Sequence, residues 1–277
     1  MLGLLAAALA VSLRQADEAS ATTTAATPAT PSPGPEPAEG VWFRGDFESG
    51  GLAAWTGDLP RPESVEMVTE PVRQGRYAVR VTLAPGDRAS HKERTELRLA
   101  DRSLERTHAG EGRTVWYGWS MLLPEDHADP PGGQYPILAQ WHHRPAGPSR
   151  GAGPAHVTGP PPLALYLVSG AGKQSLVLIG QETPDALPRR LAERPIARGR
   201  WIDLVVQVRW SAGDDGFVAA WIHGEPFTDG RRHGPTLYNP AGNYLRIGYY
   251  RGKGGTTTNR VYYDELWMGE RGPAALR

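Results

Sequence analysis

From Val41 onward the chain consists of short runs in which apolar and polar residues alternate. This period of two predicts β-strands, because successive side chains of a strand point to opposite faces of a sheet. Clusters of glycine, proline, aspartate and asparagine separate the runs, and these residues favour turns. The predicted strands are residues 41–47, 64–69, 77–83, 93–99, 114–123, 136–142, 163–168, 175–180, 201–210, 216–223, 243–250 and 260–268.

The series shows no long helical period and no internal repeat. Many short strands at this spacing predict an all-β sandwich or barrel. The segment SAGDDG joins the strands 201–210 and 216–223, which predicts a hairpin. We expect strand 260–268 to pair with strand 41–47 and close the domain. The segment 144–162 is rich in proline and glycine and long for a loop, so it is a candidate lid.

The residues before Val41 lack this alternation. Residues 1–16 contain an apolar stretch too short to span a bilayer, which we interpret as the h-region of a signal peptide without its usual basic start. A short buried helix is the alternative. Residues 17–40 are rich in Thr, Ala and Pro, which predicts a disordered linker. We therefore expect export to the periplasm, the cell surface or the medium, and one mature domain, 41–277, without a membrane span.

Composition excludes several classes of protein. The chain has 30 Lys and Arg against 30 Asp and Glu, and this zero net charge argues against a nucleic-acid or anionic-membrane binder. A polyanion would need a local basic patch. The chain has no cysteine, which excludes disulfides and thiol chemistry. We expect a monomer.

Three predicted strands, 93–99, 136–142 and 243–250, share an unusual polar face. A merely solvated face usually carries Lys, Glu, Thr and Ser, whereas these faces carry Arg, Gln, His and Tyr. If the strands are neighbours in one sheet, these side chains line one binding surface. Strand by strand, the polar residues are Arg94, Glu96 and Arg98; Gln140 and His142; and Tyr244, Arg246 and Tyr250.

These strands resemble a group of polysaccharide lyases that includes the heparin-lyase-I-like, glucuronan-lyase and alginate-lyase families. The motifs of that group are R-(S/T/N)-E-L, Q-(I/V)-H and Y-F-K-A-G-(V/N)-Y. This chain has RTEL at 94–97, QWH at 140–142 and YLRIGYY at 244–250, in the same order. The resemblance covers about residues 41 to 270 and implies a β-jelly roll, a sandwich of two antiparallel sheets with a concave substrate groove. Trp141 replaces a small aliphatic residue, and Arg246 stands where lysine is typical.

The resemblance implies an endo-acting lyase that cleaves a 4-linked uronic acid by β-elimination. Arg94 and Gln140 would neutralise the sugar carboxylate, which makes the C5 proton easier to remove. His142 would be the base and Tyr250 the acid that protonates O4. In a syn elimination Tyr250 would serve as both, which requires a depressed pKa.

The remaining predicted ligands of an anionic polysaccharide are Arg246, Glu96, Arg98, Lys92 and Tyr244. Each site residue also has an ordinary structural alternative: a cross-strand ion pair for Arg94 and Glu96, a surface histidine for His142, and a sheet aromatic for Tyr250. We expect His143 to face away from His142. We expect core positions for Trp116, Trp119, Trp141, Trp221 and Tyr249.

The proposed elimination requires no cofactor. A structural Ca²⁺ is a separate hypothesis, with Asp46, Glu48 and Asp264 near the terminal strands as candidate oxygen ligands.

Glucuronan-like or glycosaminoglycan-like substrates are favoured over alginate, because the sequence flanking the motifs is closer to the heparin-lyase-like branch. Two other functions compete with the lyase. One is a non-catalytic carbohydrate-binding jelly roll. The other is a glycoside hydrolase, which needs two opposed carboxylates, whereas the polar strands clearly offer only Glu96.

Overall fold

The structure is a computed structural model that describes residues 40–48, 51–99, 109–129, 134–143, 159–170, 173–238 and 242–276. The predicted signal peptide, the linker up to residue 39 and residues 144–158 of the candidate lid lie outside these ranges. The described residues form β-strands and two short 3₁₀ helices, η1 (Pro62–Ser64) and η2 (Ala274–Leu276). No helix among them is long and apolar enough to cross a membrane.

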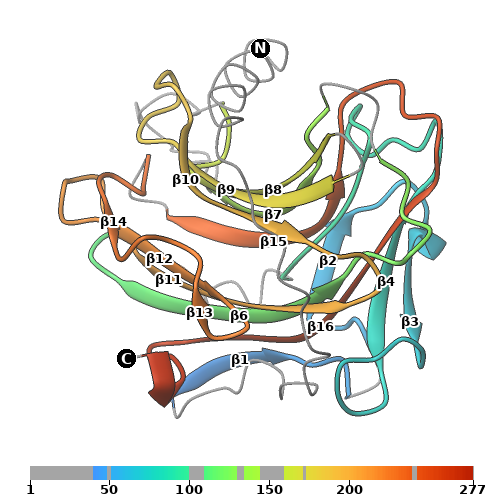
Figure 1. Ribbon diagram of the computed structural model, residues 1–277, viewed down its shortest axis with the longest axis horizontal. Helices are drawn as coiled ribbons and strands as arrows, with labels where there is room; N and C mark the ends of the chain where they lie inside the picture. The colour runs from blue at the N-terminus through green and yellow to red at the C-terminus, as the bar shows by residue number, and fades with distance from the viewer. Residues whose placement is uncertain are drawn as a thin grey trace, which may run out of the picture.

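Two antiparallel sheets lie one above the other (Figure 1). The nine-stranded sheet has the order β13 (Glu225–Pro226), β12 (Phe217–Ile222), β11 (Trp201–Arg209), β6 (Thr114–Leu122), β16 (Asn259–Gly269), β4 (Ala78–Leu83) and β3 (Val65–Val68). In addition, β1 (Val41–Gly45) pairs with β16 and β14 (Arg232–His233) pairs with β12.

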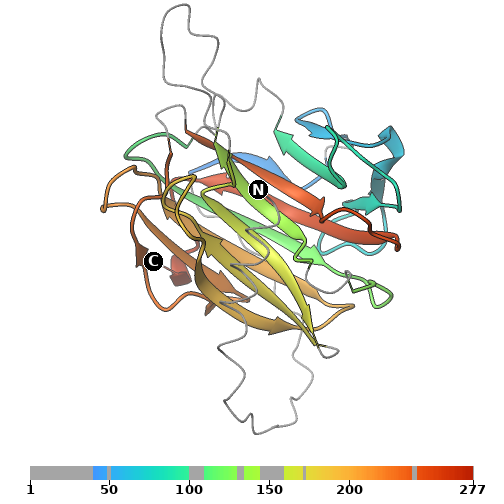
Figure 2. The ribbon, with the colours of Figure 1, turned by 90° about the horizontal axis from the view of Figure 1, so that it is seen from above.

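The seven-stranded sheet curves so that its outer face is concave, and Figure 2 looks down onto this sheet. Its order is β10 (Arg189–Ile196), β9 (Lys173–Gly180), β8 (Leu163–Gly170), β7 (Ile137–His143), β15 (Asn243–Tyr250), β5 (Arg94–Leu99) and β2 (Trp55–Asp58). The strands that were predicted to share a polar face are therefore neighbours: β7, β15 and β5.

The core lies between the inner faces of the two sheets. Trp119, Trp141 and Tyr249 are buried there, as predicted. Tyr263 on β16 joins the sheets, because its hydroxyl lies 2.7 Å from the carbonyl oxygen of Leu138 on β7 and 2.6 Å from that of Gly248 on β15. The inner face thus fixes the position of the two strands that carry most of the polar site residues.

Most of the sequence-based predictions of strands and pairing are confirmed. The all-β sandwich, the β11–β12 hairpin and the pairing of β1 with β16 are present. The prediction missed β2, β10 and the two-residue strands β13 and β14. β2 contains Gly57 and Asp58, and β10 is a polar edge strand that contains Pro195, so neither shows strong strand propensity.

Trp116 is buried, as expected, but in a separate cluster with Val205 and Trp267, whereas Trp221 is only partly buried, so its expected core placement is wrong. Both lie on the outer face of the nine-stranded sheet, where they stack with ring centres 5.4 Å apart. The alternation along β6 explains this, because Val115 and Tyr117 on either side of Trp116 point into the core.

Candidate active site on the concave face

The register of β7, β15 and β5 brings the predicted site residues together on the concave face. Arg246 on β15 lies opposite Gln140 on β7 and opposite Arg98 on β5. Four residues further along β15, on the same face, Tyr250 lies opposite Arg94. At the other end of β15, Tyr244 lies opposite His142.

Glu96 is at the centre of this group, and its side chain is only 3% exposed. Its Oε2 lies 3.5 Å from Nη1 of Arg94 and 3.4 Å from Nη1 of Arg246. Gln140 donates a hydrogen bond from Nε2 to Oε1 of Glu96. Burial raises the pKa of the Glu96 carboxyl, and the two guanidinium groups and the Gln140 amide oppose this effect. Glu96 therefore acts on the site by holding Arg94, Arg246 and Gln140 in place.

Asp58 is a member of the group that the sequence analysis missed. Its Oδ2 forms an ion pair with Nη2 of Arg94 at 2.7 Å and accepts a hydrogen bond from Nη1 of Arg246 at 2.5 Å. The edge strand β2 places Asp58 opposite Glu96 on β5. The two arginines therefore face two carboxylates on adjacent strands. The role of Asp58 could be predicted only if strand β2 were predicted. The sequence does not predict β2, because its four residues show no clear alternation of apolar and polar side chains.

Arg94 retains hydrogen-bonding capacity. Its Nε is buried and has no hydrogen-bond partner among the described residues. Its guanidinium carbon lies 5.8 Å from the centre of the Tyr250 ring. The Arg94 side chain is 16% exposed on the concave face, and its planar guanidinium suits a planar anionic ligand such as a carboxylate.

The contacts of His142 favour the role of a base. Its Nδ1 lies 3.1 Å from the carbonyl oxygen of His143. Because a carbonyl only accepts, Nδ1 carries the hydrogen and Nε2 carries the lone pair. Burial lowers the pKa of His142 to about 4, and the nearby cations Arg246 and Arg94 act in the same direction. His142 is therefore neutral at pH 7. His143 is buried, but the expectation that it faces away from His142 is wrong, because the centres of the two rings lie 4.4 Å apart.

Tyr250 favours the role of an acid. Burial raises the pKa of its phenol above the usual value of 10, and the Arg94 charge opposes this only in part. A tyrosine that acts as a base requires a depressed pKa, so the raised pKa of Tyr250 differs from that expectation. The pKa is raised because Tyr250 packs against an apolar cluster on the concave face that includes Ile137 and Tyr166.

That apolar cluster extends the concave face across β7, β8 and β9. Its buried members are Ile137, Ala164, Tyr166, Val177 and Ile179. No residue of β8 or β9 was predicted to line the site, because a strand with apolar residues on both faces resembles a fully buried strand. The concave face thus has a charged half and an apolar half, and Tyr250 lies where they meet.

The remaining predicted binding residues lie around the charged half. The Tyr244 hydroxyl lies 2.7 Å from Nη2 of Arg246, and the Tyr244 ring lies 6.1 Å from that of His142. Arg98 is half-buried on the same face, opposite Arg246 and Thr56. Lys92 lies in the tight turn before β5, which is closed by hydrogen bonds with the backbone of Ala89.

The calcium candidates each bind backbone N–H groups. Glu48 Oε1 accepts from Arg76 and Tyr77 at 2.8 and 2.9 Å, and Asp264 Oδ2 accepts from Arg73 at 2.8 Å. Asp46 accepts from the Glu48 backbone at 3.2 Å. Within the described ranges, no set of three or more His, Cys, Asp or Glu side chains is arranged to hold a metal.

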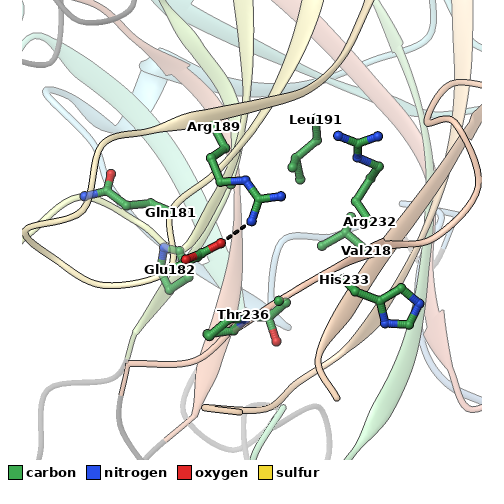
Figure 3. Close-up of a pocket in the computed structure, with 12 residues that line it drawn as sticks. Gln181, Glu182, Arg189, Leu191, Val218, Arg232, His233 and Thr236 are labelled. Atoms are coloured by element: carbon green, nitrogen blue, oxygen red, sulfur yellow. Dashed lines mark hydrogen bonds and ion pairs between the residues drawn. The ribbon is translucent and has the colours of Figure 1, made fainter. Parts of the chain in front are cut away.

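Figure 3 shows a small hollow between β9–β10 and β12–β14. Arg189 and Glu182 form an ion pair at this hollow, and Leu191 and Val218 contribute apolar walls. None of the predicted site residues lines it. The concave face, and not this hollow, is therefore the candidate active site.

A family model described as polysaccharide lyase matches residues 45–267. No curated protein matches the chain.

Three solved structures illustrate the fold. An endo-β-1,4-glucuronan lyase from Trichoderma reesei is 18% identical, with a TM-score of 0.51 over 86% of this chain and 94% of that chain. Alginate lyase A1-II′ of family 7 is 14% identical, with a TM-score of 0.55 over 82% and 99%. The catalytic domain of a glycoside hydrolase family 131 protein from Coprinopsis cinerea is 12% identical, with a TM-score of 0.54 over 84% and 95%. At these identities the likeness shows the fold alone, and that fold also occurs in a hydrolase.

Proposed function

The chain belongs to the polysaccharide lyase family, and we propose that it is an endo-acting enzyme that cleaves a 4-linked uronic-acid-containing polysaccharide by β-elimination. One observation carries this proposal. Arg94, whose side chain is 16% exposed on the concave face, lies beside the protonated phenol of Tyr250 and on the same face as the neutral imidazole of His142.

In the proposed reaction, Arg94 and the second N–H of the Gln140 amide bind the sugar carboxylate. This binding stabilises the negative charge that develops when the C5–H bond breaks. Nε2 of His142 takes the C5 proton, and the electron pair of that bond forms the C4–C5 double bond. The C4–O4 bond breaks and O4 takes the phenol proton of Tyr250. Syn elimination with Tyr250 in both roles is the alternative pathway.

We propose a glucuronan-like or glycosaminoglycan-like substrate over alginate. The shared fold is compatible with both substrates, since a glucuronan lyase and an alginate lyase both have it. The sequence that flanks the motifs is closer to the heparin-lyase-like branch. A polymeric substrate also supports export of the enzyme, in agreement with the apolar N-terminal stretch.

The positions of the carboxylates argue against a glycoside hydrolase. A hydrolase needs two carboxylates on opposite sides of the scissile bond. Asp58 and Glu96 instead lie directly opposite each other on adjacent strands, and both pair with Arg94 and Arg246. These carboxylates are therefore suited to holding the arginines.

The test is ultraviolet absorbance during incubation with glucuronan, heparin, heparan sulfate, hyaluronan, alginate and polygalacturonate, because only elimination creates an absorbing double bond. We expect an increase with one uronate polymer, lost in His142→Ala and Tyr250→Phe. Tyr77→Phe, which removes a phenol outside the site, is the control and should retain activity. No increase with any polymer, together with binding of one of them, would show a non-catalytic carbohydrate-binding protein instead.

A further inference from the structure

A second hollow lies on the outer face of the nine-stranded sheet, on the other side of the sandwich from the concave face. Its volume is about 440 Å³, within the range of about 300–1,000 Å³ that is typical of small-molecule sites. Its floor is formed by β6, β11 and β12, and its walls by the segment after β12 and the C-terminal residues. The lining residues are Trp116, Gln207, Ala219, Ala220, Trp221, Pro226, Thr228, Gly230, Arg231, Glu270, Arg271 and Leu276.

Two tryptophans form the apolar part of this hollow. Trp116 and Trp221 stack with an interplanar angle of 17°. Trp116 is buried and Trp221 is partly exposed, so Trp116 supports the ring that faces outward. Ala219 on β12 is paired with Gln207 on β11. Its small side chain leaves space in the hollow next to the two tryptophans. An exposed, supported indole is a flat surface on which the apolar C–H face of a sugar ring can pack.

Gln207 supplies an independent indication of a ligand. Gln207 lines the hollow and is only 9% exposed. Its side-chain amide has no hydrogen bond with another described residue. The donor and the acceptor of this amide are therefore available to a ligand inside the hollow. A primary amide both donates and accepts, which suits sugar hydroxyl groups.

The rim of the hollow is cationic. Arg231 and Arg271 line it and are exposed, and Arg231 is held with its guanidinium carbon 4.4 Å from the centre of the Phe217 ring. The one acidic lining residue, Glu270, lies 3.8 Å from Arg113. Guanidinium groups at this position favour a ligand that carries carboxylates.

We propose that this hollow is a second, non-catalytic carbohydrate site that binds a uronic-acid-containing chain. Trp221 packs against a sugar ring, Gln207 binds its hydroxyls, and Arg231 and Arg271 bind its carboxylates. Only the identity of the polymer rests on the proposed function. Because the hollow and the active site lie on opposite faces of the sandwich, one enzyme molecule holds polymer at a place separate from the place where it cleaves.

The test is isothermal titration calorimetry of the Tyr250→Phe variant with sized hexasaccharides from the six polymers named above. We expect two sites per chain for one of them. Adding Trp221→Ala or Gln207→Leu should reduce this to one site. Trp201→Ala is the matched control, since Trp201 is also a partly exposed tryptophan on this sheet but does not line the hollow, and it should retain two sites.

The outcomes separate this inference from the proposed function. Suppose that the wild type cleaves a polymer, and that Trp221→Ala and Gln207→Leu each bind as many hexasaccharides per chain as the Trp201→Ala control. The inference is then wrong and the proposed function stands. If no polymer is cleaved but binding depends on Trp221 and Gln207, the inference stands and the function is wrong. Absence of binding to all six hexasaccharides overturns the inference. Should Trp221→Ala fail to fold by circular dichroism, Gln207→Leu alone decides, because it keeps the side-chain volume and the stacked tryptophans.

Discussion

Arg94 and Arg251 are both paired with glutamates, yet they differ in what their donors contact. Arg251 is fully buried, and its guanidinium donates to Glu93, to Asn259 and to backbone carbonyls. Arg94 is 16% exposed, faces Asp58 and Glu96, and retains a buried N–H without a partner among the described residues. A saturated arginine stabilises the fold, whereas an unsaturated one is suited to bind a ligand.

The ion pair of Glu93 and Arg251 is adjacent in sequence to two candidate site residues, Arg94 and Tyr250. Glu93 precedes Arg94, and Arg251 follows Tyr250, and the backbone N–H of Arg251 donates to the carbonyl of Glu93 at 3.0 Å. Because strand side chains alternate between faces, one step along the chain separates a structural ion pair from the candidate active site. Substitutions on either side of this step should therefore separate stability from activity.

Arg251→Met should lower the free energy of unfolding by about 3–5 kcal/mol, because it leaves the Glu93 carboxylate buried without its cation. Urea unfolding followed by tryptophan fluorescence measures the change. Glu93→Gln combined with Arg251→Met should cost less than the two single changes added together. A loss below about 1 kcal/mol in Arg251→Met would mean that the pair is not structural.

Arg94→Ala should lower kcat by about 10²–10³-fold, the usual effect of removing one preorganised donor to developing charge. Its unfolding free energy should change less than that of Arg251→Met, since Arg94 is not saturated. Initial rates of double-bond formation and urea unfolding give both quantities. Arg98→Ala, on the same strand and face, is the control and should change KM more than kcat. An unchanged kcat in Arg94→Ala would remove it from the catalytic group.

Asp58→Asn should lower KM for the anionic polymer roughly fivefold, equivalent to about 1 kcal/mol, because it removes a negative charge that competes for Arg94 and Arg246. Steady-state kinetics at low and high salt measure this effect, which salt should weaken. Asp185→Asn makes the same change of charge at an exposed loop position and should leave KM unchanged. A higher KM in Asp58→Asn would show that orienting the arginines outweighs the competition.

The acid limb of kcat/KM against pH should have its midpoint near pH 4, because the pKa of His142 is lowered to about 4 and the base must be neutral. Rates measured from pH 3 to pH 8 test this. In Arg246→Gln the limb should move to higher pH, since a cation that lowers this pKa is gone. Arg113→Gln, on the other sheet, is the control. A wild-type midpoint between pH 6 and 7 would contradict the burial of His142.

The sequence was sufficient to predict the sandwich and the charged half of the concave face. Alternation placed Arg94, Gln140 and Tyr250 on faces that the sheet register then brought together. Asp58 could not be found in this way, because WTGD has no strand pattern and its role depends on pairing across the sheet. The saturation of Arg251 depends on carbonyl groups from separate loops, and no local pattern encodes it.

Tyr263 lies beneath the active site, in the opposite sheet, and contacts the carbonyls of β7 and β15 where their register shifts between Ile247 and Tyr250. The spacing between the proposed base and the proposed acid is therefore held by a buried residue of the other sheet. Under the proposed function, a side chain of the concave face can be exchanged to change the preferred substrate while Tyr263 keeps these two groups at the same distance.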